Sequence, residues 1–160
     1  HLHKLITVCS IYLPPSLKYN LEDLNNLYQQ LPQPALLLGD FNAHSTLWGC
    51  NNNSNDSCIL ESFIEKEDLV ILNDGSHTFL HPGNGALSAI DLSICSPTLS
   101  IDFMWNAAND QYGSDHFPIF ISINIPEAGN ISRWQLHRAN WETYQSVCLE
   151  EITQEKFIEY

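Results

Sequence analysis

Apolar residues gather in short runs along the chain, and the runs alternate between strand and helix patterns. The β-branched run Leu5–Leu13 ends at a Pro-Pro pair, which predicts a strand buried on both faces. Leucines recur at helical spacing over Asn20–Leu31, with Asn20 as the candidate N-cap. Shorter apolar runs predict strands over Ala35–Leu38 and Leu69–Leu72. This alternation of strands and helices predicts an α/β fold with a mixed sheet.

Polar stretches separate these elements. The Asn-rich segment His44–Ser57 predicts a surface loop, and Cys58–Asp68 places its apolar residues on one face of a short amphipathic helix. The tripeptide Asn73–Gly75 is a strong turn signal. We therefore expect Thr78–Leu80 to pair with the strand that precedes this turn.

Two further strands are predicted in the second half of the chain, over Ser88–Cys95 and Phe117–Ile125. Beyond them the sequence changes to a Pro/Gly/Asn break and then to a more polar helical pattern over Trp141–Tyr160. This change in composition predicts a domain boundary near Glu127.

The charge balance is strongly acidic. Six Lys and Arg face nineteen Asp and Glu, which gives a formal net charge of −13, and no Lys or Arg lies between Glu67 and Ser132. A chain that binds nucleic acid through its own basic surface is therefore disfavoured. A site where carboxylates hold a metal ion, which in turn meets an anionic substrate, remains open.

The cysteines exclude two other classes of protein. Five is an odd number, and none of the spacings matches a CxxC pair, which disfavours both a disulfide framework and a structural zinc site. Reduced, mostly buried thiols are the expectation, as in an intracellular protein. No apolar run approaches the roughly twenty residues of a membrane helix.

Two acidic motifs stand at the ends of apolar strands. In LLLGDFNAH, Asp40 and Asn42 follow a strand and a glycine, at the rim where α/β sheets hold their sites; an ordinary Asx turn is the alternative. In SAIDLSI, strand-forming residues flank Asp91, which predicts a half-buried or buried carboxylate. Such a group needs a partner, either an imidazole or backbone amides.

A third motif, GSDHFPI, places Asp115 and His116 directly before a strand, although a surface loop is the alternative. His116 is the candidate partner for Asp91, because a carboxylate orients an imidazole and favours its charged form. Asp40 is then the remaining base, with Tyr12 as a neutral donor. This set, without a Gly-x-Ser-x-Gly elbow, suits metal-assisted hydrolysis of a phosphate ester.

The ordered series IYLPP, LLLGDFNAH, SAIDLSI and GSDHFPI resembles the endonuclease/exonuclease/phosphatase superfamily, in particular the endonuclease domain of jockey-type non-LTR retrotransposons. The resemblance covers roughly Ile6 to Ile123. It implies part of a DNase I-like, four-layered α/β/β/α sandwich with mixed sheets, and Mg²⁺ or Mn²⁺ as the cofactor. It also implies DNA as the substrate, nicked before reverse transcription, and a nuclear site of action.

The resemblance assigns a role to each matching residue. Asp40 activates or orients the water, and Asn42 holds the scissile phosphate. Tyr12 donates to that phosphate or to the leaving group. His116 contacts a non-bridging oxygen, and Asp91 orients His116.

The same resemblance places Asp115 at or near the metal. The family pattern begins upstream with an Asn-bearing strand and a Glu that is the principal metal ligand, and neither has a counterpart in this chain. We therefore expect residues 1–126 to be the C-terminal half of the domain, with little activity alone. The stretch after Glu127 resembles the linker that leads toward a reverse transcriptase, so we expect residues 127–160 to be that linker. The expected partners are the N-terminal half and a reverse transcriptase beyond Tyr160. Two other functions stay open: a phosphatase of the same fold acting on a phosphoinositide or nucleotide, and a catalytically dead binding module.

Overall fold

The structure is a computed structural model that describes residues 5–123 and 140–146 of the chain. Contacts divide the chain into two units, His1–Ile125 and Pro126–Tyr160, and each is described by itself. In the second unit, residues 141–146 are helical, and the rings of Trp141 and Tyr144 meet edge to face. The rest of the predicted helix lies outside the described residues, and the predicted linker stays a prediction.

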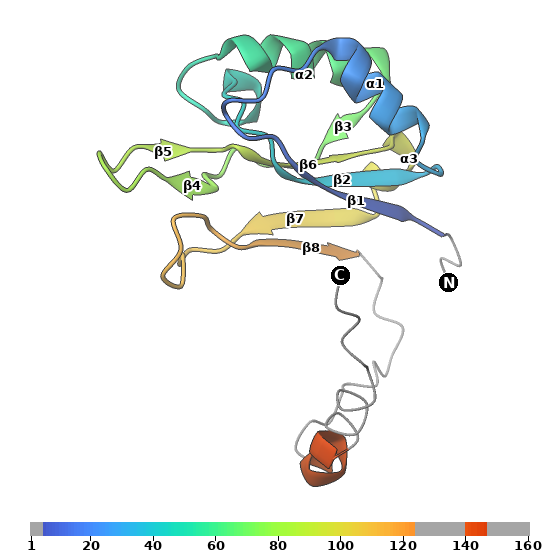
Figure 1. The fold of residues 1–160 in the computed structure, drawn as a ribbon, viewed down its shortest axis with the longest axis vertical. Coiled ribbons are helices and arrows are strands. Elements are labelled where there is room, and N and C mark those ends of the chain that lie inside the picture. The colour runs from blue at the N-terminus through green and yellow to red at the C-terminus, as the bar shows by residue number, and fades with distance from the viewer. Residues whose placement is uncertain (1–4, 124–139, 147–160) are drawn as a thin grey trace, which may run out of the picture. The chain divides into compact units, whose positions relative to one another are not determined.

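The centre of the first unit is a four-stranded mixed sheet with the order β1-β2-β6-β3 (Figure 1). Strands β1 and β2 are parallel, and helix α1 connects them, whereas β6 is antiparallel to both of its neighbours. These elements are β1 (Thr7–Tyr12), α1 (Leu21–Gln29), β2 (Ala35–Asp40), β3 (Val70–Ile71) and β6 (Asp91–Cys95).

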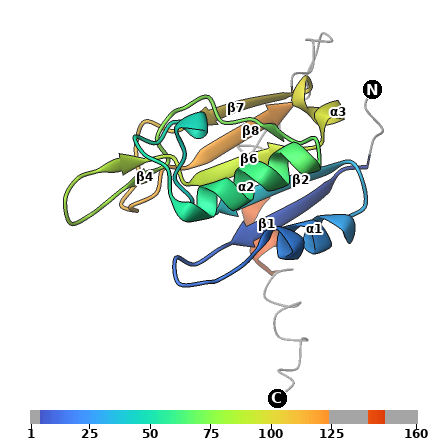
Figure 2. The same ribbon diagram turned by 90° about the horizontal axis from the view of Figure 1, so that it is seen from above.

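Helices α1 and α2 (Asn55–Lys66) cover one face of this sheet (Figures 1 and 2). Helix α1 begins with a capping box, because the Asn20 side chain accepts the backbone N–H of Asp23 while the Asp23 carboxylate accepts that of Asn20. Helix α2 begins three residues before its predicted start. The reason is Ser54, whose hydroxyl caps the helix by accepting the backbone N–H of Ser57.

The main core lies between these helices and the sheet. Trp48, at the end of the short 3₁₀ helix η1 (Thr46–Trp48), closes one side of it and donates its indole N–H to the carbonyl of Ala43. The largest fully buried apolar side chains of this core are Leu37, Phe41, Trp48, Leu60, Phe63, Leu92 and Ile94.

The opposite face of the sheet carries a second β-layer, formed by an antiparallel pair of strands (Figure 1). A smaller apolar cluster joins the two layers, with Leu36 and Cys95 from the sheet against Phe103 and Ile121. A separate hairpin lies beside the sheet, and none of the described helices is long and apolar enough to cross a bilayer. The remaining elements are β4 (Phe79–Leu80), β5 (Leu87–Ser88), α3 (Pro97–Ser100), β7 (Phe103–Ala107) and β8 (Ile119–Ile123).

The fold is therefore mixed α/β with mixed sheets, as predicted, and its layers follow the order helix, sheet, second β-layer. Strand β1 is not buried on both faces, however. Because β1 is the edge strand and its outward side chains lack cover among the described residues, Val8 is 62% exposed and Tyr12 is 66% exposed.

The pairing of the short strands also differs from the prediction. Residues Phe79–Leu80 pair with Leu87–Ser88 and not with β3, because the chain turns away at Gly75 and β3 pairs with β6 instead. The predicted strand Ser88–Cys95 divides at Ala89, so that β5 and β6 belong to different sheets. Strand β7 was not predicted.

Candidate active site

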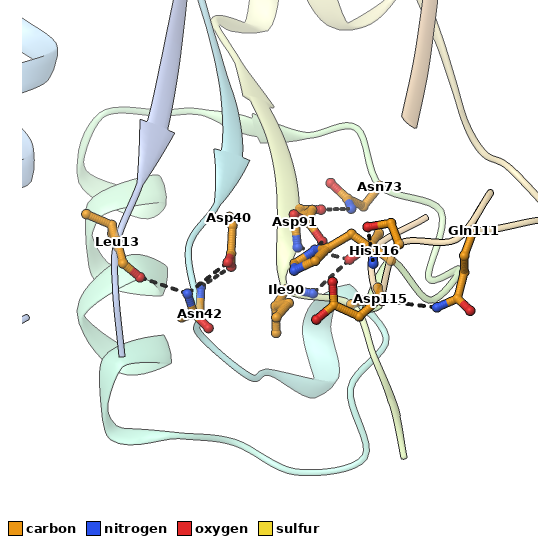
Figure 3. Close-up of polar contacts among 12 residues, drawn as sticks. Leu13, Asp40, Asn42, Asn73, Ile90, Asp91, Gln111, Asp115 and His116 are labelled. Atoms are coloured by element: carbon orange, nitrogen blue, oxygen red, sulfur yellow. Dashed lines mark hydrogen bonds and ion pairs between the residues drawn. The ribbon is translucent and has the colours of Figure 1, made fainter. Parts of the chain in front are cut away.

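Strands β1, β2 and β6 place three of the predicted site residues in one row. Tyr12 is the register partner of Asp40, and Asp40 is the register partner of Asp91. Directly paired residues share a face of the sheet. Because Leu37 and Leu92 belong to the core under the helices, this row lies on the opposite face of the sheet. Asp40 and Asp91 lie where β2 ends and β6 begins (Figure 3).

Gly39 allows β1 and β2 to approach closely just before the row. A Cβ atom added at Gly39 would lie 1.8 Å from the carbonyl oxygen of Ile11, and the φ of Gly39 is +147°. The glycine of the GDFN motif is therefore required by the backbone, and it sets the distance between the strand ends that carry Tyr12 and Asp40.

Asn42 fixes the carboxylate of Asp40. The backbone N–H of Asn42 donates to Oδ1 of Asp40 and its side-chain amide donates to Oδ2, both at 2.9 Å (Figure 3). The same amide donates to the carbonyl of Leu13 at 3.0 Å. Asn42 adopts φ +48°, a left-handed conformation that Asn tolerates well. The Asx turn and the site are thus the same structure, and both amide hydrogens of Asn42 are engaged.

The surroundings of Asp40 raise the pKa of its carboxyl. Burial raises the pKa of its carboxyl above the ordinary value, and the nearby charge of Asp91 raises it further. The hydrogen bonds from Asn42 and the proximity of His116 act in the opposite direction but do not cancel the effect. Asp40 therefore holds a proton more tightly than an exposed aspartate does.

Asp91 and His116 form a close pair. Oδ2 of Asp91 lies 2.8 Å from Nδ1 of His116, and the two side chains are 16% and 34% exposed respectively (Figure 3). The carboxylate accepts here, so Nδ1 carries the hydrogen and Nε2 is the nitrogen left for other contacts. The ring of His116 also leans against Phe79, with the centroids 4.8 Å apart.

One ligand atom each from Asp40, Asp91 and His116 lies within 4.8 Å of the other two. All three residues are half-buried, and among the described residues no Lys or Arg forms an ion pair with either carboxylate. Two carboxylates and one imidazole at this separation can hold a divalent cation.

The structure places the other two predicted site residues differently. Tyr12 lies in the same row as Asp40 but is largely exposed. Asp115 has an exposed side chain and is outside the three-residue group, whereas its backbone carbonyl accepts the N–H of Leu80 and the amide of Gln111. The roles of Tyr12 and Asp115 stay predictions.

Thr78 is a residue of the site that the sequence patterns do not single out. It is fully buried, and its hydroxyl oxygen accepts the backbone N–H groups of Ile90 and Asp91, both at 3.0 Å. Its carbonyl accepts the N–H of Phe117, the residue after His116. Thr78 therefore links the segments that carry both members of the Asp91–His116 pair. A single Thr in a short apolar run gives no sequence signal of such a role.

Two cavities adjoin the site. A groove of about 470 Å³ runs from Asp91 between the sheet and β8, with Ser10, Leu38 and Ile121 in its walls. A cavity of about 430 Å³ lies beside Asn42 on the other side. Its lining includes the imidazoles of His44 and His81. The site is therefore open to a ligand much larger than one metal ion.

The edge of the mixed sheet thus brings Asp40 and Asp91 together with His116, without a basic surface among the three. Residues 6–120 match the family described as endonuclease-reverse transcriptase, and the chain belongs to this family.

Among solved structures, the chain is similar to the endonuclease domain of TRAS1, a telomere-specific non-LTR retrotransposon. The two share 25% sequence identity with a TM-score of 0.58, and the match covers 67% of this chain and 51% of the TRAS1 chain. The chain thus spans about half the length of that domain. No curated protein matches.

Proposed function

We propose that this chain carries part of the active site of a metal-dependent endonuclease that hydrolyses a phosphodiester bond in DNA. The observation that carries the proposal is the convergence of Asp40, Asp91 and His116, whose ligand atoms lie within 4.8 Å of one another on three different segments. Membership of the endonuclease-reverse transcriptase family supports the same class of reaction.

The residues present fit a divalent cation. Oxygen ligands from carboxylates suit Mg²⁺, which typically binds one or two of them together with phosphate oxygens. Both oxygens of Asp40 already accept hydrogen bonds from Asn42, which orients the carboxylate and leaves its remaining lone pairs free. A bound Mg²⁺ supplies positive charge against the phosphate oxygens and so stabilises the charge that develops during hydrolysis.

The side chains then divide the remaining work. Asp40, which Asn42 holds in place, has lone pairs left to accept a proton from the attacking water. Asp91 holds His116 with Nε2 free to face a phosphate oxygen. Asn42 would contact the phosphate only by releasing Asp40 or the Leu13 carbonyl, so positioning Asp40 is its first role.

DNA contacts must come from groups other than fixed cations. The cavity beside Asn42 offers the amides of Asn51 and Asn52 and the imidazoles of His44 and His81. These groups donate or accept hydrogen bonds without a permanent charge. We therefore propose that affinity for DNA is modest and depends on the metal, in keeping with the net charge of −13.

The test is the conversion of supercoiled plasmid to the nicked form. Because the match spans about half of the TRAS1 domain, the assay uses both the 160-residue chain and the chain extended by its upstream coding sequence. We expect nicking in Mg²⁺ that EDTA abolishes, and at least a roughly hundredfold loss in Asp40→Asn and His116→Ala. Glu65→Gln, an exposed charge-neutralising change on α2, is the matched control and keeps full activity.

The same assay separates the alternatives. Release of inorganic phosphate from a phosphoinositide or nucleotide, without nicking, would identify a phosphatase of the same fold. Unchanged properties in both Asp40→Asn and His116→Ala, in a preparation that neither nicks nor releases phosphate, would identify a binding module.

A further inference from the structure

The backbone of Asp91 lacks a strand partner on the side that faces β3. The register of β3 with β6 ends at the pair Ile71 and Ile94, and the last main-chain bond runs from the N–H of Leu72 to the carbonyl of Ser93. The chain then turns away. The first residues of β6, which carry the site, would therefore present unpaired backbone groups on this edge.

The side chain of Asn73 takes the place of the absent strand. Its Nδ2 donates to the carbonyl of Asp91 at 2.9 Å (Figure 3). Its Oδ1 accepts the N–H of Ser93, also at 2.9 Å. A carboxamide offers one donor and one acceptor in a plane, as a peptide group does, so it reproduces the pattern of a β-ladder with a side chain.

Other contacts fix the remaining sides of Asp91. Its N–H is bound by Thr78, and its opposite strand edge pairs with Asp40 of β2. The carbonyl of Asp91 thus has Asn73 as its only partner on the β3 side within the described residues. Movement of this carbonyl would move the carboxylate that holds His116.

We propose that Asn73 is a positioning residue of the active site, which fixes the backbone of Asp91 through its amide and so sets the Asp91–His116 pair. The inference deepens the proposed function and rests on it for its catalytic meaning. The turn signal of Asn73–Gly75 predicts only a change of chain direction. The side-chain amide of Asn73 has a separate role, because it binds the backbone of β6 at the site.

The experiment compares the full chain with Asn73→Ala and Asn73→Asp. The aspartate keeps the volume and the acceptor for Ser93 but loses the donor to Asp91, so it separates hydrogen bonding from packing. The readout is the ¹⁵N NMR spectrum of His116 above about pH 8, where an ordinary imidazole is neutral and its tautomer can be read. Leu60→Ala, which opens the core far from these bonds, is the control for a general loss of stability.

In the unchanged protein we expect the Nδ1–H tautomer to predominate, because Asp91 accepts from Nδ1. Both Asn73 variants should shift the population severalfold toward the Nε2–H form, whereas Leu60→Ala should not. Unchanged tautomer populations in both Asn73 variants would overturn the proposal.

Plasmid nicking by the extended chain provides the second readout. We expect both Asn73 variants to lose nicking about tenfold in the rate at saturating DNA, with less effect on the DNA concentration for half-maximal rate. A tautomer shift in a protein that never nicks DNA would reject the proposed endonuclease while leaving the positioning intact. Normal nicking in both variants would reject the positioning while leaving the endonuclease intact.

Discussion

The two faces of the four-stranded sheet are built from alternate residues of the same strands, and they differ in what they bury. On the face under the helices, Leu37, Leu92 and Ile94 are almost completely inaccessible. On the opposite face, Asp40 and Asp91 are only half-buried. The period of two along a strand therefore places an apolar core on one face and the candidate site, at one end of the strands, on the other.

The site face is itself divided along the strands. Its middle is apolar, where Leu36 and Cys95 pack against the second β-layer, and its polar residues gather at one end. The carboxylates thus stand where the strands leave the layered core. Desolvation is enough there to raise the pKa of Asp40 without excluding a hydrated ligand.

The largest expected loss of stability comes from a substitution at Gly39, the residue of β2 just before Asp40. Gly39→Ala places a methyl group on the carbonyl of Ile11 and imposes an unfavourable φ, so β1 and β2 must separate. We expect a loss of about 4 kcal/mol in the free energy of unfolding, which is a large part of the roughly 5–15 kcal/mol of an ordinary domain. Chemical denaturation followed by circular dichroism measures it.

Gly75→Ala is the matched control. Gly75 also has a left-handed backbone, with φ +94°, but a Cβ atom there meets nothing within 4 Å. Its expected loss is therefore only the backbone cost of about 1–2 kcal/mol. Equal losses at the two glycines would show that close approach of the strands is not what Gly39 provides.

The second prediction compares the loss of stability from substitutions on the two faces of the sheet, at neighbouring residues of β6. Leu92→Ala removes a fully buried side chain from the helix-side core and should cost about 2–5 kcal/mol. Ser93→Ala removes the hydroxyl that accepts the indole N–H of Trp105 and should cost about 1–2 kcal/mol. Urea denaturation of both variants measures the difference. A larger loss of stability in Ser93→Ala than in Leu92→Ala would contradict the conclusion that the helix-side core stabilises the sheet more than the opposite face does.

Local sequence patterns were sufficient for most of the helices and strands and for the mixed α/β class. The N-cap at Asn20, the strand before Asp40 and the helix after the Asn-rich loop depend on contacts within a few residues, which a single sequence displays. The carboxylates at the strand ends could be singled out for the same reason. A charged residue beside an apolar run is visible without any knowledge of its partners.

What could not be predicted depends on contacts between distant segments. The exposure of Val8 follows from the edge position of β1. Strand β7 exposes the apolar Met104, so its inward and outward positions cannot be told apart in the sequence. The roles of Asn73 and Thr78 arise because each meets β6 more than ten residues away along the chain. Such bonds leave no periodic signature.

The smallest expected effect is a change in how the stability of the folded protein depends on pH. The comparison is between the half-buried Asp40 and the exposed turn residue Asp74. Because folding raises the pKa of Asp40, the carboxyl favours the folded state when it is protonated, below about pH 4, and that contribution is lost as the pH rises through the folded pKa. Asp40→Asn should therefore gain stability relative to the unchanged protein between about pH 3 and pH 7. Thermal melts across this range measure the difference.

Asp74 should change the stability with pH in the opposite direction, because its hydrogen bonds with Ser76 lower its pKa. Its contribution is present above the unfolded pKa and is lost as the pH falls through the folded pKa, so Asp74→Asn should lose stability relative to the unchanged protein over the same rise in pH. Added Mg²⁺ sharpens the contrast, since a cation that binds the ionised Asp40 stabilises the folded protein and should do so much less in Asp40→Asn. Parallel slopes for the two variants, or equal stabilisation of both by Mg²⁺, would mean that the sheet edge at Asp40 is electrostatically no different from the surface.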